Sequence, residues 1–139
     1  MHILDTDTLT HLHKGNEKVK RRLVEAADFD FGVTIVTKAE ILRGRIEFLL
    51  KAHDGISLEK AQSYLIESEN LLAQILTIYF DEKSFALFDE LRQNSKFRKI
   101  GRNDLLIASI CLANRAILVT RNVKHFKQFP HLEVENWVD

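Results

Sequence analysis

KIGRNDLLIASICLANRAILVTRNVKHF, residues Lys99–Phe126, joins an acidic helix start to a helix, a strand and a polar loop, and the rest of the chain is organised around it. After Asp104, its apolar residues cover most of the circumference of a predicted helix, which is typical of a buried helix. Ile117–Val119 predicts a short interior strand of a parallel sheet, and the polar residues 120–122 follow it directly. The stretch therefore places an acid at a helix N-terminus and a polar loop at the carboxyl end of a strand, the edge where open α/β sheets hold ligands.

The rest of the chain repeats this alternation of strand and helix. Hydrophobic spacing predicts further strands at residues 2–4, 31–36, 75–80 and 132–137, and helices at 6–14, 16–27, 37–53, 58–74 and 81–94. Thr37 and Glu40 have the spacing of a capping box at the start of the third helix, and Phe85 is expected to face the core. This order predicts an α/β domain with a central, mainly parallel sheet flanked by helices, into which a helical hairpin is inserted.

Composition limits the class of protein. The 139 residues suit a single domain, 1–139, and 20 basic residues balance 20 acidic ones, so the net charge does not indicate a nucleic-acid binder. The single Cys111 excludes an intramolecular disulfide and a Cys-rich zinc site, and we expect it to be a core residue. The longest apolar run is too short to span a bilayer, and no signal-peptide pattern opens the sequence. We therefore expect a cytoplasmic protein that does not associate with membranes.

Four polar side chains fall beside the predicted strand ends: Asp5, Glu40, Asp104 and Asn122. In a parallel sheet these positions share one edge, although each residue taken alone is explained as a helix-capping or first-turn group. Three carboxylates brought together would raise each other's pKa values unless a cation neutralised them, and oxygen ligands suit Mg²⁺ or Mn²⁺. The combination predicts a divalent-metal site with open positions for water and phosphate oxygens, as phosphodiester hydrolysis requires.

Five segments, in order along the chain, resemble the PIN-domain ribonucleases, and within them the VapC-type toxins of toxin–antitoxin pairs: ILDTD (3–7), VTKAEILRG (36–44), IGRNDLLIAS (100–109), ILVTRNVKHF (117–126) and LEVENW (132–137). The resemblance implies a PIN-like three-layer domain in which Asp5, Glu40 and Asp104 match the acidic metal ligands. It also implies a Mg²⁺- or Mn²⁺-dependent endoribonuclease that cleaves RNA, is held inactive by a cognate antitoxin and forms a homodimer.

Two positions depart from the family pattern. Asn122 stands where many PIN domains have a fourth acid, and its amide can hold a water or ligate weakly but supplies no charge. We keep Asn122 among the catalytic candidates, and its lack of charge argues against a second metal rather than against the first. His125 stands where an acid is often found, and we expect it to face solvent rather than to contact the RNA backbone.

Residues beside the acids are candidates for contact with RNA: Thr6, Asp7, Arg102, Thr120 and Arg121. Basic residues at 43–45, 96–102 and 121–127 could steer a phosphate backbone, although charge runs more often form solvated faces. Thr6 and Thr120 are equally well explained as local capping groups.

Two other functions fit parts of the sequence. LDTDT at residues 4–8 resembles the opening motif of aspartate-nucleophile phosphatases, in which the first Asp is phosphorylated. Asn122 fits a catalytically weak, PIN-like binding module. The helical segment Ser57–Ile75 predicts a surface for the antitoxin or for the dimer, or else an apolar stripe that packs inside the monomer.

Overall fold

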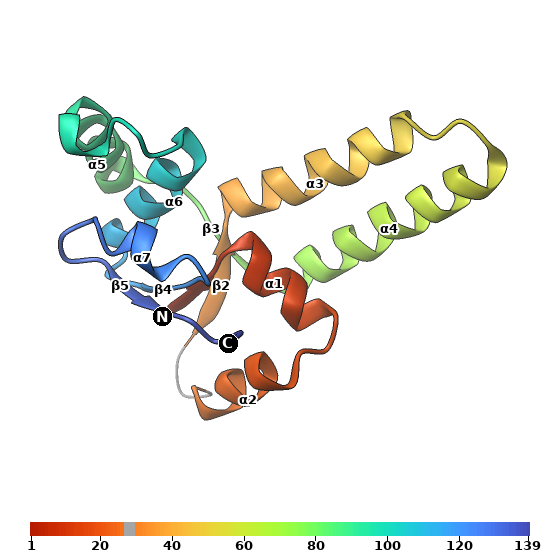
Figure 1. Ribbon diagram of the computed structural model, residues 1–139, viewed down its shortest axis with the longest axis horizontal. Helices are drawn as coiled ribbons and strands as arrows, with labels where there is room; N and C mark the ends of the chain where they lie inside the picture. The colour runs from red at the N-terminus through yellow and green to blue at the C-terminus, as the bar shows by residue number, and fades with distance from the viewer. Residues whose placement is uncertain (27–29) are drawn as a thin grey trace.

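A parallel sheet runs through the centre of the computed structural model, which describes residues 1–26 and 30–139. Its strands are β1 (His2–Leu4), β2 (Phe31–Thr34), β3 (Leu76–Ile78), β4 (Ile117–Val119) and β5 (Glu133–Glu135), in the order β3-β2-β1-β4-β5. The chain moves outward from β1 to β2 and β3, then returns to the other side of β1 for β4 and β5 (Figure 1). The strand order therefore reverses between β1 and β4, and the crevice at the carboxyl ends of these two strands is the usual ligand site of such a sheet.

Helices connect the strands. They are α1 (Thr6–His13), α2 (Glu17–Glu25), α3 (Ile35–Leu50), α4 (Gly55–Ala73), α5 (Glu82–Gln93), α6 (Arg102–Ala113) and the short α7 (Val123–Phe126), with a 3-10 turn at Ser95–Phe97. The predicted second helix extended to Ala27, which lies outside the described residues. Within the described part of the chain, no helix combines the length and apolarity that a membrane span requires.

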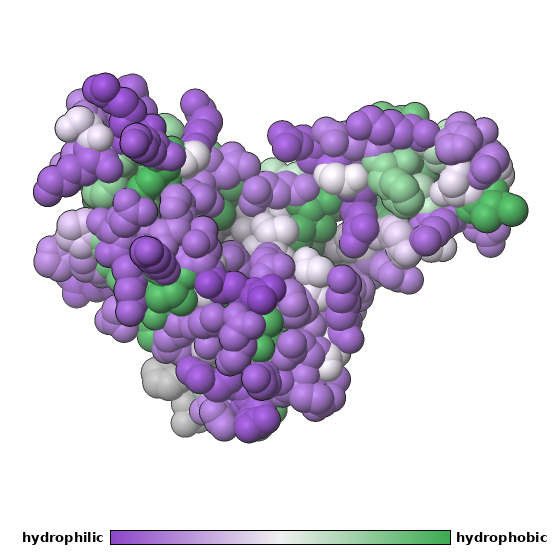
Figure 2. Space-filling view, in the orientation of Figure 1, coloured by the Kyte–Doolittle hydropathy of each residue, from purple (hydrophilic) through white to green (hydrophobic). Residues whose placement is uncertain are grey.

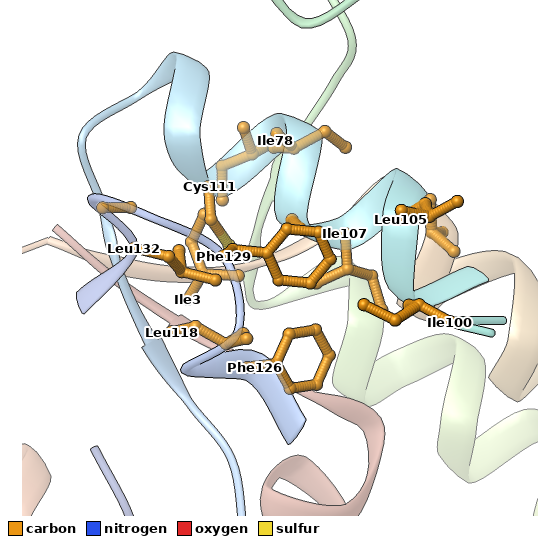
Figure 3. Packing of buried hydrophobic residues seen from close by; sticks show 14 of the residues in the cluster. Ile3, Ile78, Ile100, Leu105, Ile107, Cys111, Leu118, Phe126, Phe129 and Leu132 are labelled. Atoms are coloured by element: carbon orange, nitrogen blue, oxygen red, sulfur yellow. The ribbon is translucent and has the colours of Figure 1, made fainter. Parts of the chain in front are cut away.

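Both faces of the sheet are covered, so the predicted three-layer arrangement is confirmed. Successive residues of a strand point to opposite faces, and Ile3 and Leu118 pack on one face whereas Leu4 and Val119 pack on the other. Helices α5, α6 and α7 cover the first face, where Figure 3 shows Phe126 and Phe129 packed beside Ile107 of α6. Helices α1 and α2 cover the second face, together with the ends of α3 and α4 that lie nearest the sheet.

Cys111 lies in the first of these cores, as expected, and has no exposed surface. Burial raises the pKa of its thiol, and the negative charge of Asp5 raises it further. The thiol therefore stays protonated at neutral pH, which fits a packing role.

Helices α3 and α4 form the predicted hairpin, which extends away from the sheet as a long antiparallel arm (Figure 1). Arg45 fastens the two helices together: its Nε donates a hydrogen bond to Ser68 Oγ at 3.0 Å, and its guanidinium lies 5.1 Å from the centre of the Tyr64 ring. Towards the far end of the arm, hydrophobic surface is exposed (Figure 2), and Leu50 and Ile56 keep 78% and 84% of their surface accessible.

Two local predictions are wrong. The strand predicted at 31–36 ends at Thr34, whose side chain caps α3 by accepting a hydrogen bond from the backbone N–H of Thr37. Thr37 is therefore not the cap, and Glu40 lies inside the helix rather than in a capping box. Phe85 is 56% exposed rather than facing the core, and its ring stacks on Phe80.

Candidate active site at the carboxyl edge of the sheet

Asp5 lies directly after β1, at the point where the strand order reverses. Its carboxylate caps α1 by accepting a hydrogen bond from the N–H of Thr8 at 2.8 Å, so the capping explanation holds for this residue. The backbone of Asp5 also donates to the carbonyl of Val119, the last residue of β4, at 3.0 Å, and the buried Thr8 hydroxyl donates to the same carbonyl. These bonds fix Asp5 between the ends of β1 and β4.

Glu40 is held by side chains from two other helices. Thr6, the first residue of α1, donates its hydroxyl to Glu40 Oε1 at 3.2 Å, and Asn103, in the first turn of α6, donates its amide to Glu40 Oε2 at 3.0 Å. Because each carboxylate oxygen has its own donor, hydrogen bonds from neutral side chains orient this carboxylate. The contact also ties the starts of α1 and α6 to α3.

Asp104 occupies the first turn of α6, and its carboxylate contacts His125 of α7. The distance from Asp104 Oδ2 to His125 Nε2 is 2.9 Å. The prediction that His125 faces solvent is therefore wrong, since only 25% of its side-chain surface is exposed. Sequence spacing could not show this contact, because it depends on how α7 turns back over α6 after β4.

Hydrogen bonds and ion pairs with other residues of the protein hold the loop after β4. Thr120 is fully buried, and its hydroxyl accepts a hydrogen bond from the N–H of Asn122 at 3.1 Å, which is the local capping role. Asn122 itself is exposed and precedes α7. Arg121 binds Asp139 through two hydrogen bonds of 3.2 Å and lies 3.8 Å from Asp7. Hydrogen bonds from Asn136 and Arg121 lower the pKa of the Asp139 carboxyl.

The candidate basic residues do not all face the carboxylates. The guanidinium of Arg102 lies 5.7 Å from the ring centre of Phe88 on α5, and Arg45 is engaged inside the hairpin as described above. Arg43 is exposed and lines a cavity of about 300 Å³ together with Glu40, Phe80 and Asn103. A second cavity of about 320 Å³, lined by Thr6, Lys14 and Arg45 among others, also reaches Glu40. Glu40 thus stands between two hollows in the surface.

The donor chemistry fits a hard divalent cation. Asp5, Glu40 and Asp104 offer carboxylate oxygens beside the carboxyl ends of the sheet, and the N-termini of α1 and α6 favour negative charge there. Across residues 1–26 and 30–139, however, no three Asp, Glu, His or Cys side chains are gathered around one point as metal ligands. Their present partners are Thr8, the pair Thr6 and Asn103, and His125 respectively. Metal binding would therefore require the three carboxylates to move closer to a common centre.

The structure brings some of the predicted site residues into contact and adds one residue that the sequence did not single out. Asp5 caps α1, Glu40 and Asp104 lie on α3 and α6, and Thr6 is brought into direct contact with Glu40. Sequence reasoning missed the partner on the other side of Glu40, Asn103, because the two residues are 63 positions apart. Its one signal was its place immediately before Asp104, in the same first turn of α6.

Comparison with known proteins gives a consistent family relationship. The sequence profile of the PIN domain matches residues 3–132. Ribonuclease VapC2 of Rickettsia felis is 46% identical over a local match that covers 48% of this chain and 51% of that protein. Ribonuclease VapC1 of Haemophilus influenzae strain R2866 is 26% identical over 99% of this chain and 98% of its own length. Among solved structures, VapBC2 from Rickettsia felis bound to a promoter DNA fragment superposes with a TM-score of 0.75 at 30% identity, covering 98% of either chain.

Proposed function

The chain belongs to the PIN-domain family, and on that premise we propose that it is a divalent-metal-dependent endoribonuclease, the toxin of a VapBC-type toxin–antitoxin pair. The observation that carries the proposal is the position of Asp5, Glu40 and Asp104 around the carboxyl edge of the sheet, with Glu40 oriented from both sides by Thr6 and Asn103. The names of two curated relatives, Ribonuclease VapC2 and Ribonuclease VapC1, support the same activity.

In this proposal Asp5, Glu40 and Asp104 hold one Mg²⁺ or Mn²⁺, and when bound the ion supplies positive charge against the phosphodiester and makes a water more acidic. Thr6 and Asn103 keep the Glu40 carboxylate in place, so that less side-chain freedom is lost when the ion binds. The N-termini of α1 and α6 attract the negatively charged phosphate to the same edge. Exposed Arg43 lines the hollow beside Glu40 and is a candidate contact for the RNA backbone.

The activity is tested by incubating the purified protein with a pool of structured RNAs in Mn²⁺, in Mg²⁺ and in EDTA. We expect cleavage with metal, none in EDTA, and none by Asp104→Asn. The matched control is Asp54→Asn, which removes the same charge at the distant end of the hairpin and keeps a good capping residue there (Figure 1). If the wild type binds Mn²⁺ tightly but leaves every RNA intact, the protein is a binding module and the proposed activity is wrong.

We propose that a cognate antitoxin covers the exposed hydrophobic surface of the hairpin. Phe48, Leu50, Ile56 and Ile66 are all at least 42% exposed on α3 and α4, which is costly for an unpartnered surface. Introducing charge there with Ile56→Glu should weaken binding of the antitoxin while leaving RNA cleavage by the free toxin unchanged. If Ile56→Glu and the wild type bind the antitoxin equally well, the antitoxin does not use this end of the hairpin.

We also propose that the protein is a homodimer, as the family resemblance implies. Light scattering coupled to gel filtration should give about twice the mass of the chain, with the same value over a tenfold range of concentration. A mass equal to one chain throughout that range would contradict the dimer.

A further inference from the structure

His125 presents a ring nitrogen to the carboxylate of Asp104. Its Nε2 lies 2.9 Å from Asp104 Oδ2, and the edge of the ring packs against Phe126 with 5.3 Å between ring centres. Phe126 is buried in the core, so it anchors the short helix α7 that carries His125. Within the described ranges, Asp104 is the one acidic side chain within ion-pair distance of this imidazole. The ring is therefore held at the edge of the candidate metal site and not in open solvent.

We propose that His125 is a nitrogen ligand of the divalent ion, so that the site takes a first-row transition metal such as Mn²⁺ in preference to Mg²⁺. The inference rests on the metal site of the proposed function and adds a donor to it. Neighbouring ligands of an octahedral ion with bonds of roughly 2.1 Å stand about 3.0 Å apart. The 2.9 Å between His125 Nε2 and Asp104 Oδ2 is the length of the hydrogen bond that joins them, and both atoms could bind one ion at this separation once the proton between them has left.

The preference for the metal follows from the type of donor. Carboxylate oxygens alone suit Mg²⁺ and Mn²⁺ alike, whereas a neutral imidazole is a common ligand of transition metals and a poor one for Mg²⁺. Asn122, which follows β4, can add an amide oxygen but no charge. His125 therefore gives the site binding energy toward a transition metal that a site made only of oxygen ligands lacks.

The test is pulsed electron paramagnetic resonance of the protein loaded with Mn²⁺, which detects nitrogen bound directly to the ion. In the wild type we expect a coupling between Mn²⁺ and a nitrogen nucleus. This coupling should change when the protein is labelled with ¹⁵N-histidine, and it should disappear in His125→Asn. The control is His53→Asn, which removes an exposed histidine in the loop between α3 and α4 and should leave the coupling unchanged.

Calorimetry measures the metal preference independently of RNA cleavage. We expect Mn²⁺ to bind His125→Asn about tenfold more weakly, with Mg²⁺ binding changed less than threefold. His125→Asp should bind both ions well but give no nitrogen coupling. If Mn²⁺ binds at the site of the wild type but shows no nitrogen coupling, His125 is not a ligand and this inference is wrong, although the proposed ribonuclease activity is not affected. If no Mn²⁺ binds at all, the metal site itself is wrong and both proposals fail.

Discussion

Replacing Gly32 with alanine should disrupt the pairing of β2 with β3, just before the helix α3 that carries Glu40. Gly32 lies in β2 opposite Leu76 of β3, and a Cβ added there would stand 2.5 Å from the Leu76 carbonyl oxygen and 2.7 Å from Ile78 Cδ1. The first of these distances is roughly 0.9 Å short of ordinary contact at 3.4 Å. Because the nearest atom belongs to the backbone of the neighbouring strand, rotation of a side chain cannot relieve the clash.

The size of the effect follows from that geometry. Overpacking of this kind costs about 1–3 kcal/mol, and the entropy that alanine removes from the unfolded chain returns only about 0.4–1 kcal/mol. We therefore expect Gly32→Ala to lower the free energy of unfolding by about 1.3 kcal/mol, the difference between the middles of these two ranges. Gly44→Ala is the matched control, since an added Cβ there meets no atom within 4 Å in the interior of α3. That change should stabilise the protein by about 0.5–1 kcal/mol.

Urea unfolding followed by circular dichroism measures both variants. With a slope of about 2 kcal/mol per molar urea, the midpoint of Gly32→Ala should fall by about 0.7 M, and that of Gly44→Ala should rise by a few tenths of a molar. Equal midpoints for Gly32→Ala and the wild type would refute the close approach of β2 and β3. So would an equal loss of stability in both variants, because it would show that position 32 is no more crowded than position 44.

Three further outcomes are expected. Asn103→Leu should weaken Mn²⁺ binding about tenfold in calorimetry by releasing Glu40, with an unchanged unfolding midpoint because Asn103 is exposed; equal affinity would contradict the positioning role. Phe129→Ala should cost about 3–5 kcal/mol in urea unfolding, since the ring is 2% exposed and stacks on Phe97; a loss below about 1 kcal/mol would contradict this packing. Burial lowers the pKa of His2 below 6.5, so the unfolded chain takes up the proton more readily and stability should fall as the pH drops below about 6.5. His2→Asn should reduce that fall between pH 7 and pH 5, and an identical pH dependence in both proteins would exclude His2 as its source.

Local sequence signals predicted most of the fold. The buried helix after Asp104 and the strand Ile117–Val119 are confirmed as α6 and β4, and Asp5 caps the first helix. The boundary after β2 was wrong because Ile35 and Val36 are β-branched and resemble strand residues. In the structure Thr34 caps the chain into a helix at that point. Secondary-structure preference could not reveal this, because side-chain capping at Thr34 decides where the helix begins.

Only part of the candidate site could be predicted from the sequence, because some of its contacts join residues that are far apart in the chain. The positions of Asp5 and Asp104 follow from parallel strands and buried helices, which the hydrophobic pattern shows directly. The contacts of Asn103 with Glu40 and of His125 with Asp104 join residues 63 and 21 positions apart. They depend on the distances between packed helices, which no local pattern encodes.

Diffraction from crystals soaked in MnCl₂, recorded where manganese scatters anomalously, would show whether a divalent ion binds between Asp5, Glu40 and Asp104. We expect one strong peak within roughly 2.5 Å of carboxylate oxygens from Asp5, Glu40 and Asp104. In that state the three carboxylates have moved closer together around the ion, and Glu40 is still held by Thr6 and Asn103. The absence of a peak there, in crystals whose three carboxylates are well ordered and accessible to solvent, would contradict the claim that this edge of the sheet binds a divalent metal.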